Sequence, residues 1–563
     1  MSNLLGTLQQ SASALQVSQL GVQVVGNNIA NTNTEGYIRQ ELQQASAIGV
    51  RQGNLVVGHG VRAVGVRQKV DQQLLERMFN AQTALSGAEQ LRASLGQLEQ
   101  LSGDLNGGGL GDQLSQFDAA IQELSTQPND PSLREFVLRQ ADTLTNAIRT
   151  NRAEAVRLGE QANNSFADAA NRINELTSRI ADLNVEIATI EGGGTIRSDA
   201  TGLRERRYND LEELSKFVNL NIQEQDTGVV NVFVGGDYLV SNGIRREVYT
   251  AYNESLGGSE VRIVETDSPL QATGGLIAAA AQSRDGAFGN YVQRLDEVAV
   301  GLIRGFNEIH ASGQGGRGFD SVTSTEQVVA GVPLPSAQLA FEPRNGSFDI
   351  QVRDGEGELI STHRIDVRNL GRVGDSTVNS IVNDINAIDG ITARVNSAGQ
   401  VEIDSDASTA TFNFIDDNSG FLAAVGINTF FTGTSGLDID VNAKLLEDSD
   451  YLAVSRAGIG ADTEVLSDLI GVIDRPLEHL GGTSVRGRYE QFLTGIGQQI
   501  AVQQSSLQGL SDFHATLRSQ HLAISGVNID EESIKLIAYQ RAFQASSRVI
   551  STASEMLELL VNL

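Results

Sequence analysis

At 563 residues the chain is long enough for several domains, each with a sizeable hydrophobic core. Its 70 acidic and 41 basic side chains give a formal net charge of -29 at pH 7. A polyanion of this kind repels nucleic acid and anionic membrane surfaces, so we expect neither as a partner.

The chain contains no cysteine, which excludes structural disulfides, thiol chemistry and metal sites with cysteine ligands. Its longest apolar run, Leu276–Ala281, is far too short to cross a membrane. The first residues lack the basic region and apolar core of a secretory signal peptide. We therefore expect a cytosolic protein, or one that leaves the cell by a route without such a peptide. The lack of cysteine suits export in an unfolded form.

Residues 4–37 and 525–563 each carry one apolar stripe whose members are alternately three and four residues apart, a rhythm typical of a coiled-coil seam. The N-terminal stripe comprises Leu4, Leu8, Ser11, Leu15, Ser18, Val22, Val25 and Ile29. The C-terminal stripe comprises Ala538, Ala542, Ala545, Val549, Thr552, Met556, Leu559 and Leu563. Neither helix can bury its own stripe, so we predict that the two ends pair through these seams and form an assembly interface.

Both seams are rich in small or polar residues and bury little apolar area. We therefore expect the two ends to be weakly paired or disordered in the monomer and to fold on assembly. Asn528, followed three residues later by Glu531, predicts a capping box at the start of the C-terminal helix.

Between the two ends, helical periodicity covers residues 70–101, 110–124, 132–190, 203–217 and 275–310, and returns after Asp462 with breaks near Gly481 and Ser525. Strand-like alternation covers 54–68 and most of 220–268 and 314–450, with a helix at 377–388. The glycines of Glu191–Gly194 indicate a hinge or turn. The charged helix 203–217 is expected to present a solvated face.

These patterns predict an α+β multidomain fold with nested domains and both termini at one end. Residues 1–36 and 525–563 would form a terminal coiled coil. Residues 37–313 and 451–524 would form a helical stem with a small β subdomain near 220–268. Residues 314–450 would form a β-rich inserted outer domain.

No residue pattern indicates catalysis, a cofactor or a metal. His514 and His521 share a helical face but lie too far apart to bind one ion, so we expect a surface pair. The acidic clusters at 353–358, 404–406 and 415–418 do not reproduce a twelve-residue calcium loop and are interpreted as turns between strands. The chain contains no P-loop, GxSxG or HExxH motif.

The sequence ANTNTEGY at residues 30–37 matches the ANxxTxGY signature of bacterial flagellar axial proteins, which the chain therefore resembles. The matching residues are Ala30, Asn31, Thr34, Gly36 and Tyr37. Further stretches, among them 60–75, 126–144, 203–243, 302–313 and 525–563, resemble the hook-associated protein 1 family within that group.

The resemblance implies a structural subunit without enzymatic activity, secreted unfolded by the flagellar type III apparatus and placed outside the cell between hook and filament. It implies self-assembly into a ring at the hook tip, on which the filament is then assembled. The implied partners are the hook protein, the second hook-associated (junction) protein, the filament cap protein and an export chaperone bound to the C-terminal helix. It implies no cofactor.

Three alternatives stay open. A hook or distal-rod subunit would share the octet at 30–37, although the long helical stem from residue 70 to 190 favours the junction subunit. An extracellular adhesin or ligand-binding protein would use the insertion at 314–450 as its head. An acidic hydrolase with an unrecognised carboxylate pair has little support in the sequence.

Overall fold

The computed structural model describes residues 2–34, 36–47, 49–52, 55–103, 108–192, 199–406, 410–458 and 462–561. The chain forms two compact units. The terminal unit comprises Met1–Ala93, Gln161–Ser283 and Ala501–Leu563, and the central unit comprises Ser94–Glu160 and Arg284–Ile500. Both units contain helices, and strands occur in both, which confirms the α+β class. The division into a terminal coiled coil, a stem and an inserted domain stays a prediction.

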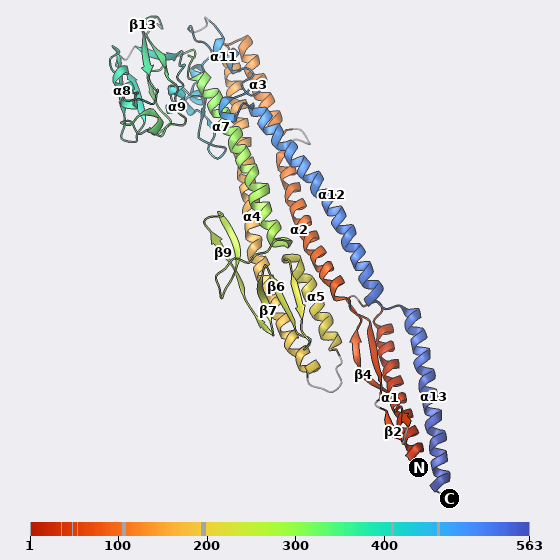
Figure 1. Ribbon diagram of the computed structural model, residues 1–563. Helices are drawn as coiled ribbons and strands as arrows, with labels where there is room; N and C mark the ends of the chain where they lie inside the picture. Colours follow the sequence, from red (N-terminus) through yellow and green to blue (C-terminus); the bar gives the residue numbers. More distant parts are fainter. Residues whose placement is uncertain are drawn as a thin grey trace. The chain divides into compact units, whose positions relative to one another are not determined.

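The two ends of the chain lie side by side in the terminal unit (Figure 1). Helix α1 (Ser2–Ala30) runs antiparallel to α13 (Ile529–Val561), so the N- and C-termini lie at the same end of the pair. A second face of α1 packs on the antiparallel strands β1 (Gln40–Ser46) and β4 (Val61–Gln68). The short strands β2 (Val50–Gln52) and β3 (Leu55–Val57) pair with each other.

The rest of the terminal unit surrounds one large hydrophobic core. The core joins parts of α2 (Gln72–Ser102), α4 (Pro131–Gly192), α5 (Thr201–Phe217) and α6 (Gly275–Ala281) to a β subdomain. The subdomain has a four-stranded antiparallel sheet of order β5-β6-β7-β8 and a hairpin of β9 and β10. The strands are β5 (Asn221–Glu224), β6 (Val230–Val234), β7 (Asp237–Ser241), β8 (Ile244–Arg245), β9 (Val248–Asn253) and β10 (Gly258–Ile263).

Three asparagines of α4 attach these strands to the helix. The amide of Asn174 donates to the Val248 carbonyl at 2.7 Å and accepts from the Val248 N–H at 2.8 Å. Asn184 bonds both backbone groups of Val230 in the same way, at 2.7 and 3.1 Å. Asn163 accepts from the Ser259 N–H at 2.7 Å and donates to its hydroxyl at 3.0 Å. Each side chain therefore satisfies backbone or hydroxyl groups that would otherwise lack a partner on this side of the strand.

Helix 203–217 keeps an exposed face as expected, but two arginines of α5 are directed inward. Arg204 bonds Glu191 at the end of α4 and Glu224 of β5. Arg207 is fully buried and donates to the Asn184 side chain at 2.8 Å and to the Gly228 carbonyl at 2.7 Å. Burial lowers the pKa of Arg207, and the carbonyl and amide oxygens replace part of its lost hydration.

The expected surface pair of histidines is also wrong. His514 and His521 lie on α12 (Val485–Ser525), where their Nε2 and Nδ1 atoms, respectively, are shielded from solvent without a hydrogen-bond partner among the described residues. Between them, Leu517 packs on Leu74 and Met78 of α2. Burial lowers the pKa of both imidazoles. The pair therefore belongs to a contact between helices.

The central unit combines helices with the strands of the predicted insertion. Its helices include α3 (Leu110–Thr126), α7 (Asn290–His310), α8 (Val378–Ile385), α9 (Phe421–Val425), α10 (Ala443–Glu447) and α11 (Glu464–Leu469), with short 3₁₀ turns at Leu334–Ser336, Ser449–Tyr451 and Glu478–Leu480. Its antiparallel sheets have the orders β13-β12-β16, β11-β15-β14 and β17-β18. The strands are β11 (Ser321–Thr323), β12 (Gly346–Arg353), β13 (Leu359–Val367), β14 (Ile391–Val395), β15 (Val401–Ser405), β16 (Thr411–Ile415), β17 (Phe431–Thr432) and β18 (Asp440–Val441).

An aromatic cluster fills part of the central core. The rings of Phe117, Phe306, Phe430 and Phe431 lie 4.6–6.0 Å apart between centroids. Beside them His310 is fully buried, and its Nε2 accepts from the Ala453 N–H at 3.0 Å. Its Nδ1 must therefore carry the proton and donate to the Asn428 carbonyl, 2.8 Å away. Burial lowers the pKa of His310 to about 4, so the ring is neutral at physiological pH.

Most predicted helices agree with the structure within a few residues. The helix expected at 275–310 is an exception, because a π-helical segment, Gln282–Gly289, separates α6 from α7. Of the expected hinge at residues 191–194, Glu191 and Gly192 end α4, and the remainder lies outside the described residues. No helix in the described ranges is long and apolar enough to span a membrane.

Candidate assembly site

The pair of α1 and α13 approaches closely at Gly21. A Cβ atom on Gly21 would lie 2.6 Å from the Tyr539 ring, so this position has no room for a side chain unless the ring moves. Seven residues further along α1, Asn28 donates to the Glu532 carboxylate at 2.8 Å. Glu532 precedes Tyr539 by the same seven residues, which is two helical turns. The two contacts therefore belong to one antiparallel seam.

A cluster of polar side chains, three of them buried, lies where α1 ends and α13 begins. We name Asn28, Tyr37, Arg39, Glu531 and Glu532 the terminal node. Arg39 donates from Nε to Glu532 at 2.9 Å and from Nη2 to Glu531 at 2.8 Å. The Tyr37 hydroxyl donates to the side-chain amide oxygen Oδ1 of Asn28 at 2.9 Å. The node thus joins the first helix, the segment after it and the last helix.

The octet at 30–37 has the shape that this junction requires. Helix α1 ends at Ala30, and Asn31 and Thr34 bond each other through their side chains at 3.2 Å. Gly36 has a φ of 79° and, as expected, uses the positive φ that glycine tolerates. The Tyr37 N–H then bonds back to the Thr34 carbonyl at 3.2 Å, which returns the Tyr37 ring to Asn28. Glu35 lies outside the described residues.

The charges of the node are paired where they are buried. The side chain of Arg39 is 7% exposed and that of Glu532 is 1% exposed, and Nη2 of Arg39 lies 2.8 Å from Glu532. Burial alone would lower the pKa of Arg39, but its bonds to Glu531 and Glu532 raise it. Burial, with the charges of Glu205 and Glu532, raises the pKa of Tyr37 to about 12. Tyr37 is therefore a hydrogen-bond donor over the whole physiological range.

The node is also attached to the rest of the terminal unit. The backbone N–H of Arg39 donates to the Ser525 carbonyl, the last residue of α12, at 2.8 Å. The next amide toward the N-terminus, that of Ile38, donates to Glu205 of α5 at 3.2 Å. Gln68 at the end of β4 binds the same carboxylate at 3.2 Å. Neighbouring residues after the octet thus contact three helices, α5, α12 and α13.

Only one of the two hydrogen bonds of the predicted capping box forms at the start of α13. The Asn528 side chain accepts from the N–H groups of Asp530 at 2.9 Å and Glu531 at 3.3 Å, as an N-cap residue should. The Glu531 carboxylate does not return to the Asn528 backbone but bonds Arg39. Glu531 lies at the positive end of the helix dipole as expected, and its partner comes from another segment.

The predicted seam of α13 is not the face that meets α1. On α1, Leu8, Leu15, Val22 and Ile29 are half-buried and Val25 is 2% exposed. The predicted residues of α13 are exposed in the single chain, namely Ala538, Ala542, Ala545, Val549, Met556 and Leu559. The face toward α1 instead carries Glu532 and Tyr539, and it includes the buried Ala553.

The pairing of the two ends was predicted, but the pairing face of α13 was wrong. The observed face lies one residue further along the helix, a rotation of about 100°. Residues on this face are also alternately three and four positions apart. Several of them, including Glu532, Tyr539 and Ser546, are polar, so a search for apolar residues at that spacing does not find this face. The polar partners Asn28 and Arg39 identify that face, and they stand next to the octet in the sequence.

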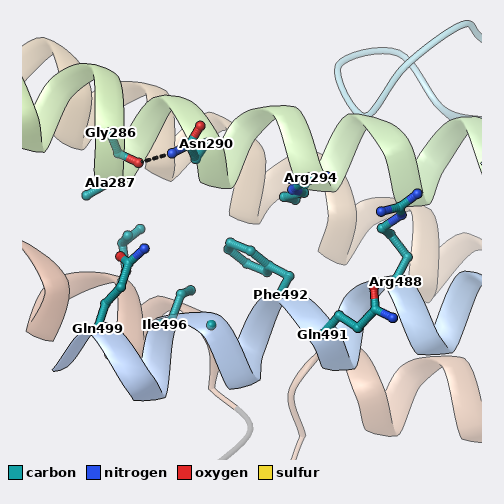
Figure 2. A pocket seen from close by; sticks show the side chains of 11 residues that line it. Gly286, Ala287, Asn290, Arg294, Arg488, Gln491, Phe492, Ile496 and Gln499 are labelled. Atoms are coloured by element: carbon teal, nitrogen blue, oxygen red, sulfur yellow. Dashed lines mark hydrogen bonds between the residues drawn. The ribbon is translucent and has the colours of Figure 1, made fainter. Parts of the chain in front are cut away.

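A cavity in the central unit lies between α7 and α12 (Figure 2). It has a volume of about 270 Å³ and is lined by Arg294, Arg488, three amide side chains and apolar or glycine residues. Both arginines approach Glu297, at 2.8 and 3.4 Å. No carboxylate, imidazole or hydroxyl lines the cavity, so the lining supplies no general acid or base. Among the described residues, no group of three or more potential ligands could hold a metal ion.

Three family models match separate parts of the chain. The helical domain of the flagellar hook-associated protein FlgK matches residues 95–321. The flagella basal body rod protein model matches residues 8–37, and the C-terminal model of the flagellar basal body rod FlgEFG proteins matches residues 518–563. The last two ranges contain most of α1 with the octet and the whole of α13. They include every residue of the terminal node except Arg39, which lies two residues beyond the first range.

Curated relatives cover nearly all of the chain. Flagellar hook-associated protein 1 of Escherichia coli (strain K12) is 24% identical over 572 residues, which covers 99% of each chain. The protein of the same name from Salmonella typhimurium (strain LT2) is 24% identical over 585 residues, again with 99% of each chain covered. A solved structure of the flagellar hook junction protein FlgK from Burkholderia pseudomallei has a TM-score of 0.49 and 14% identity, over 80% of this chain and 100% of that one.

The full-length relatives carry one name, and the family models match the two paired ends and the helical middle. The chain is thus similar to flagellar hook-associated protein 1 over nearly its whole length, and these matches identify it as a structural subunit of the flagellar axis.

Proposed function

We propose that this subunit forms the junction between hook and filament and is needed for filament assembly. One observation carries the proposal. The ends of the chain pair with each other through the polar terminal node, while a second face of α13 stays exposed. In such an arrangement, α1 and α13 pair within each subunit, and the exposed face of α13 remains as an apolar surface for neighbouring subunits.

The proposed assembly interface combines that exposed face with the outer part of α1. Val549 is 43%, Met556 53% and Leu559 67% exposed. The interface residues on α13 are Ala538, Ala542, Ala545, Val549, Met556 and Leu559. On α1 they are the half-buried Leu8, Leu15, Val22 and Ile29, whereas Val25 is already covered within the single chain. The octet residues Ala30, Asn31, Thr34, Gly36 and Tyr37 form the segment that follows α1. Small residues on α13 suit close packing of many copies.

We further propose export through the flagellar type III apparatus and self-assembly into a ring at the hook tip. A chain without cysteine cannot form a cross-link that would hinder passage in unfolded form. The ring would contact the hook protein, the second hook-associated (junction) protein and the filament cap protein. The exposed face of α13 would bind an export chaperone before assembly, because an apolar helical stripe suits a helix-binding partner.

The first experiment is electron microscopy of cells that lack this protein, with flagellin assayed in the medium. Complete hooks without filaments, together with shed flagellin, are the expected result. Absent or truncated hooks would instead assign the subunit to the hook or rod. Normal flagella would contradict any role in the axis and favour an adhesin.

A second experiment tests the exposed face of α13. Val549→Asp places a charge on the proposed interface and should abolish incorporation of the secreted subunit, while helical content stays normal. Gln544→Asp is the matched control, because Gln544 is an exposed polar residue on the same helix outside the stripe. Normal filaments with Val549→Asp would show that this face is no interface. Failed secretion of that variant would point to chaperone binding.

A further inference from the structure

The chain breaks between α12 and α13 at residues Gly526–Asn528, which we name the elbow (Figure 1). Glycine and asparagine tolerate the backbone conformations of a turn. A link of this kind does not by itself determine the angle between α12 and α13. The elbow is bridged by a residue far away in the sequence. Arg39 contacts both sides of the break.

On the α12 side, the contact comes from the backbone of Arg39. Its N–H donates to the carbonyl of Ser525, the last residue of α12, at 2.8 Å. This carbonyl is one of the final four of the helix and lacks a partner within it. The Ser525 residue is 1% exposed, so water offers little substitute for the Arg39 amide.

On the α13 side, the contact comes from the guanidinium of Arg39. Its planar fork reaches two consecutive carboxylates in the first turn of α13, Glu532 at 2.9 Å and Glu531 at 2.8 Å. Two bonds from one rigid plane fix direction as well as distance. Lys535 lies 3.4 Å from the same Glu532 oxygen but belongs to α13 itself and cannot hold the elbow.

We infer that Arg39 is a positioning residue that fixes the elbow, and so sets the direction in which α13 leaves α12. The backbone of Arg39 holds the end of one helix, and its side chain holds the start of the next. Arg39 is itself held in place, because β1 begins at the next residue and the Ile38 amide is bonded to Glu205. The elbow is thus fixed by a support outside α12 and α13.

One consequence rests on the proposed function. If the exposed face of α13 is the assembly interface, Arg39 determines where that interface points in every subunit. The fixed elbow itself does not depend on that proposal. It can therefore be tested on the purified full-length chain, apart from any flagellar assay.

The absence of cysteine allows spin labels at chosen sites without other substitutions. We would place them at the exposed positions Ser511 of α12 and Gln544 of α13, as Ser511→Cys and Gln544→Cys, and measure their distance distribution by pulsed electron paramagnetic resonance. The parent should give one narrow maximum. Arg39→Ala should lose that maximum and give a broad distribution, with helical content unchanged by circular dichroism.

Tyr37→Phe is the matched control. It removes one node bond, from the Tyr37 hydroxyl to Asn28, and leaves every contact across the elbow in place. Its distribution should stay narrow. A narrow distribution for Arg39→Ala would overturn the inference, and so would equal broadening by Tyr37→Phe, because both would remove the special role of Arg39.

If Arg39→Ala loses helical content, Arg39→Lys replaces it. Lysine keeps the positive charge and reaches one carboxylate, but it has no planar fork for two. A distribution broader than the parent's, at full helical content, would support the inference. A distribution equal to the parent's would show that charge alone is sufficient and would overturn the role of the fork. The failure of this experiment would leave the hook–filament proposal untouched.

Discussion

Two contact regions of the terminal unit differ in the kinds of side chain that they bury. The contact between α4, α5 and the β subdomain is centred on large aliphatic side chains, with Ile173, Leu176 and Leu214 fully buried beside Val232 and Val234, and its polar bonds lie around them. The contact between α1 and α13 contains Gly21, Ser18 and Ala553 and ends in the terminal node. The first region buries large side chains, and the second brings backbones close together around a few polar bonds.

The difference concerns stability and specificity. Burial of large aliphatic side chains contributes about 1.5–3 kcal/mol each, so the first region can hold its own fold. A buried ion pair contributes little net stability, but a single partner left behind is strongly destabilising. We therefore expect the first region, around the large hydrophobic core, to be stable by itself. We expect the pair of α1 and α13 to adopt a single arrangement, and the two helices to separate when that arrangement is disrupted.

The largest effect is expected at the node. Glu532→Ala removes the buried carboxylate that both Arg39 and Asn28 bind and leaves Arg39 with the exposed Glu531 alone, which should destabilise the pair of α1 and α13 by about 3–5 kcal/mol. Hydrogen exchange should show faster exchange in α1 and α13 and no change in α4. Limited proteolysis should then remove both ends first. Glu558→Ala, at an exposed position of the same helix, should change neither measurement.

Leu176→Ala tests the apolar side of the comparison. Leu176 is fully buried in the large core, so the cavity left behind should lower the free energy of unfolding of the stem region by about 2–5 kcal/mol. Denaturant unfolding followed by circular dichroism measures the loss. Val185→Ala, at a half-exposed position of α4, should change stability by less than about 0.5 kcal/mol. Equal effects of the two variants would contradict the assigned core.

The dependence of stability on pH should distinguish a buried neutral histidine from the paired charges of the terminal node. His310 is neutral in the folded state because burial lowers its pKa to about 4, whereas the node charges are paired. The unfolded chain binds a proton near pH 6.5, so stability is complete above that pH and is lost as the pH falls toward 4. The loss should reach about 3 kcal/mol in the central unit.

Thermal unfolding across this pH range measures the effect. His310→Gln should remove most of the dependence on pH, and His363→Gln, at a half-buried position of β13, should leave it in place. A wild-type protein whose central unit keeps its stability down to pH 4 would contradict a buried neutral His310.

The smallest effect is expected where α4 holds the hairpin. Asn174→Ala leaves the N–H and C=O of Val248 without their partners, which should cost about 1–3 kcal/mol. Hydrogen exchange in β9 and β10 should become faster, while the terminal pair stays unchanged. Asn171→Ala, at an exposed position one turn away, is the control. Unchanged exchange in the hairpin would show that the apolar core alone holds it.

The sequence was sufficient for features that depend on local rules. Helical and strand periodicities located most elements, and the octet predicted the positive φ of Gly36 and the link to flagellar axial proteins. Features that depend on distant partners were missed. Arg207 looked solvated because its acceptors come from α4 and the turn at Gly228. The face of α13 was misassigned because Glu532 has its partners some five hundred residues away, at Asn28 and Arg39.

The three asparagines of α4 have a mechanical consequence. Asn163, Asn174 and Asn184 stand about three helical turns apart, so their attachments are spread over roughly 30 Å of the helix axis. A force that shears the β subdomain along α4 acts on all three attachments at once, so each of them bears only part of the force. A force that peels it from one end would break them one after another. The subdomain should therefore resist sliding along the helix far better than lifting away from it.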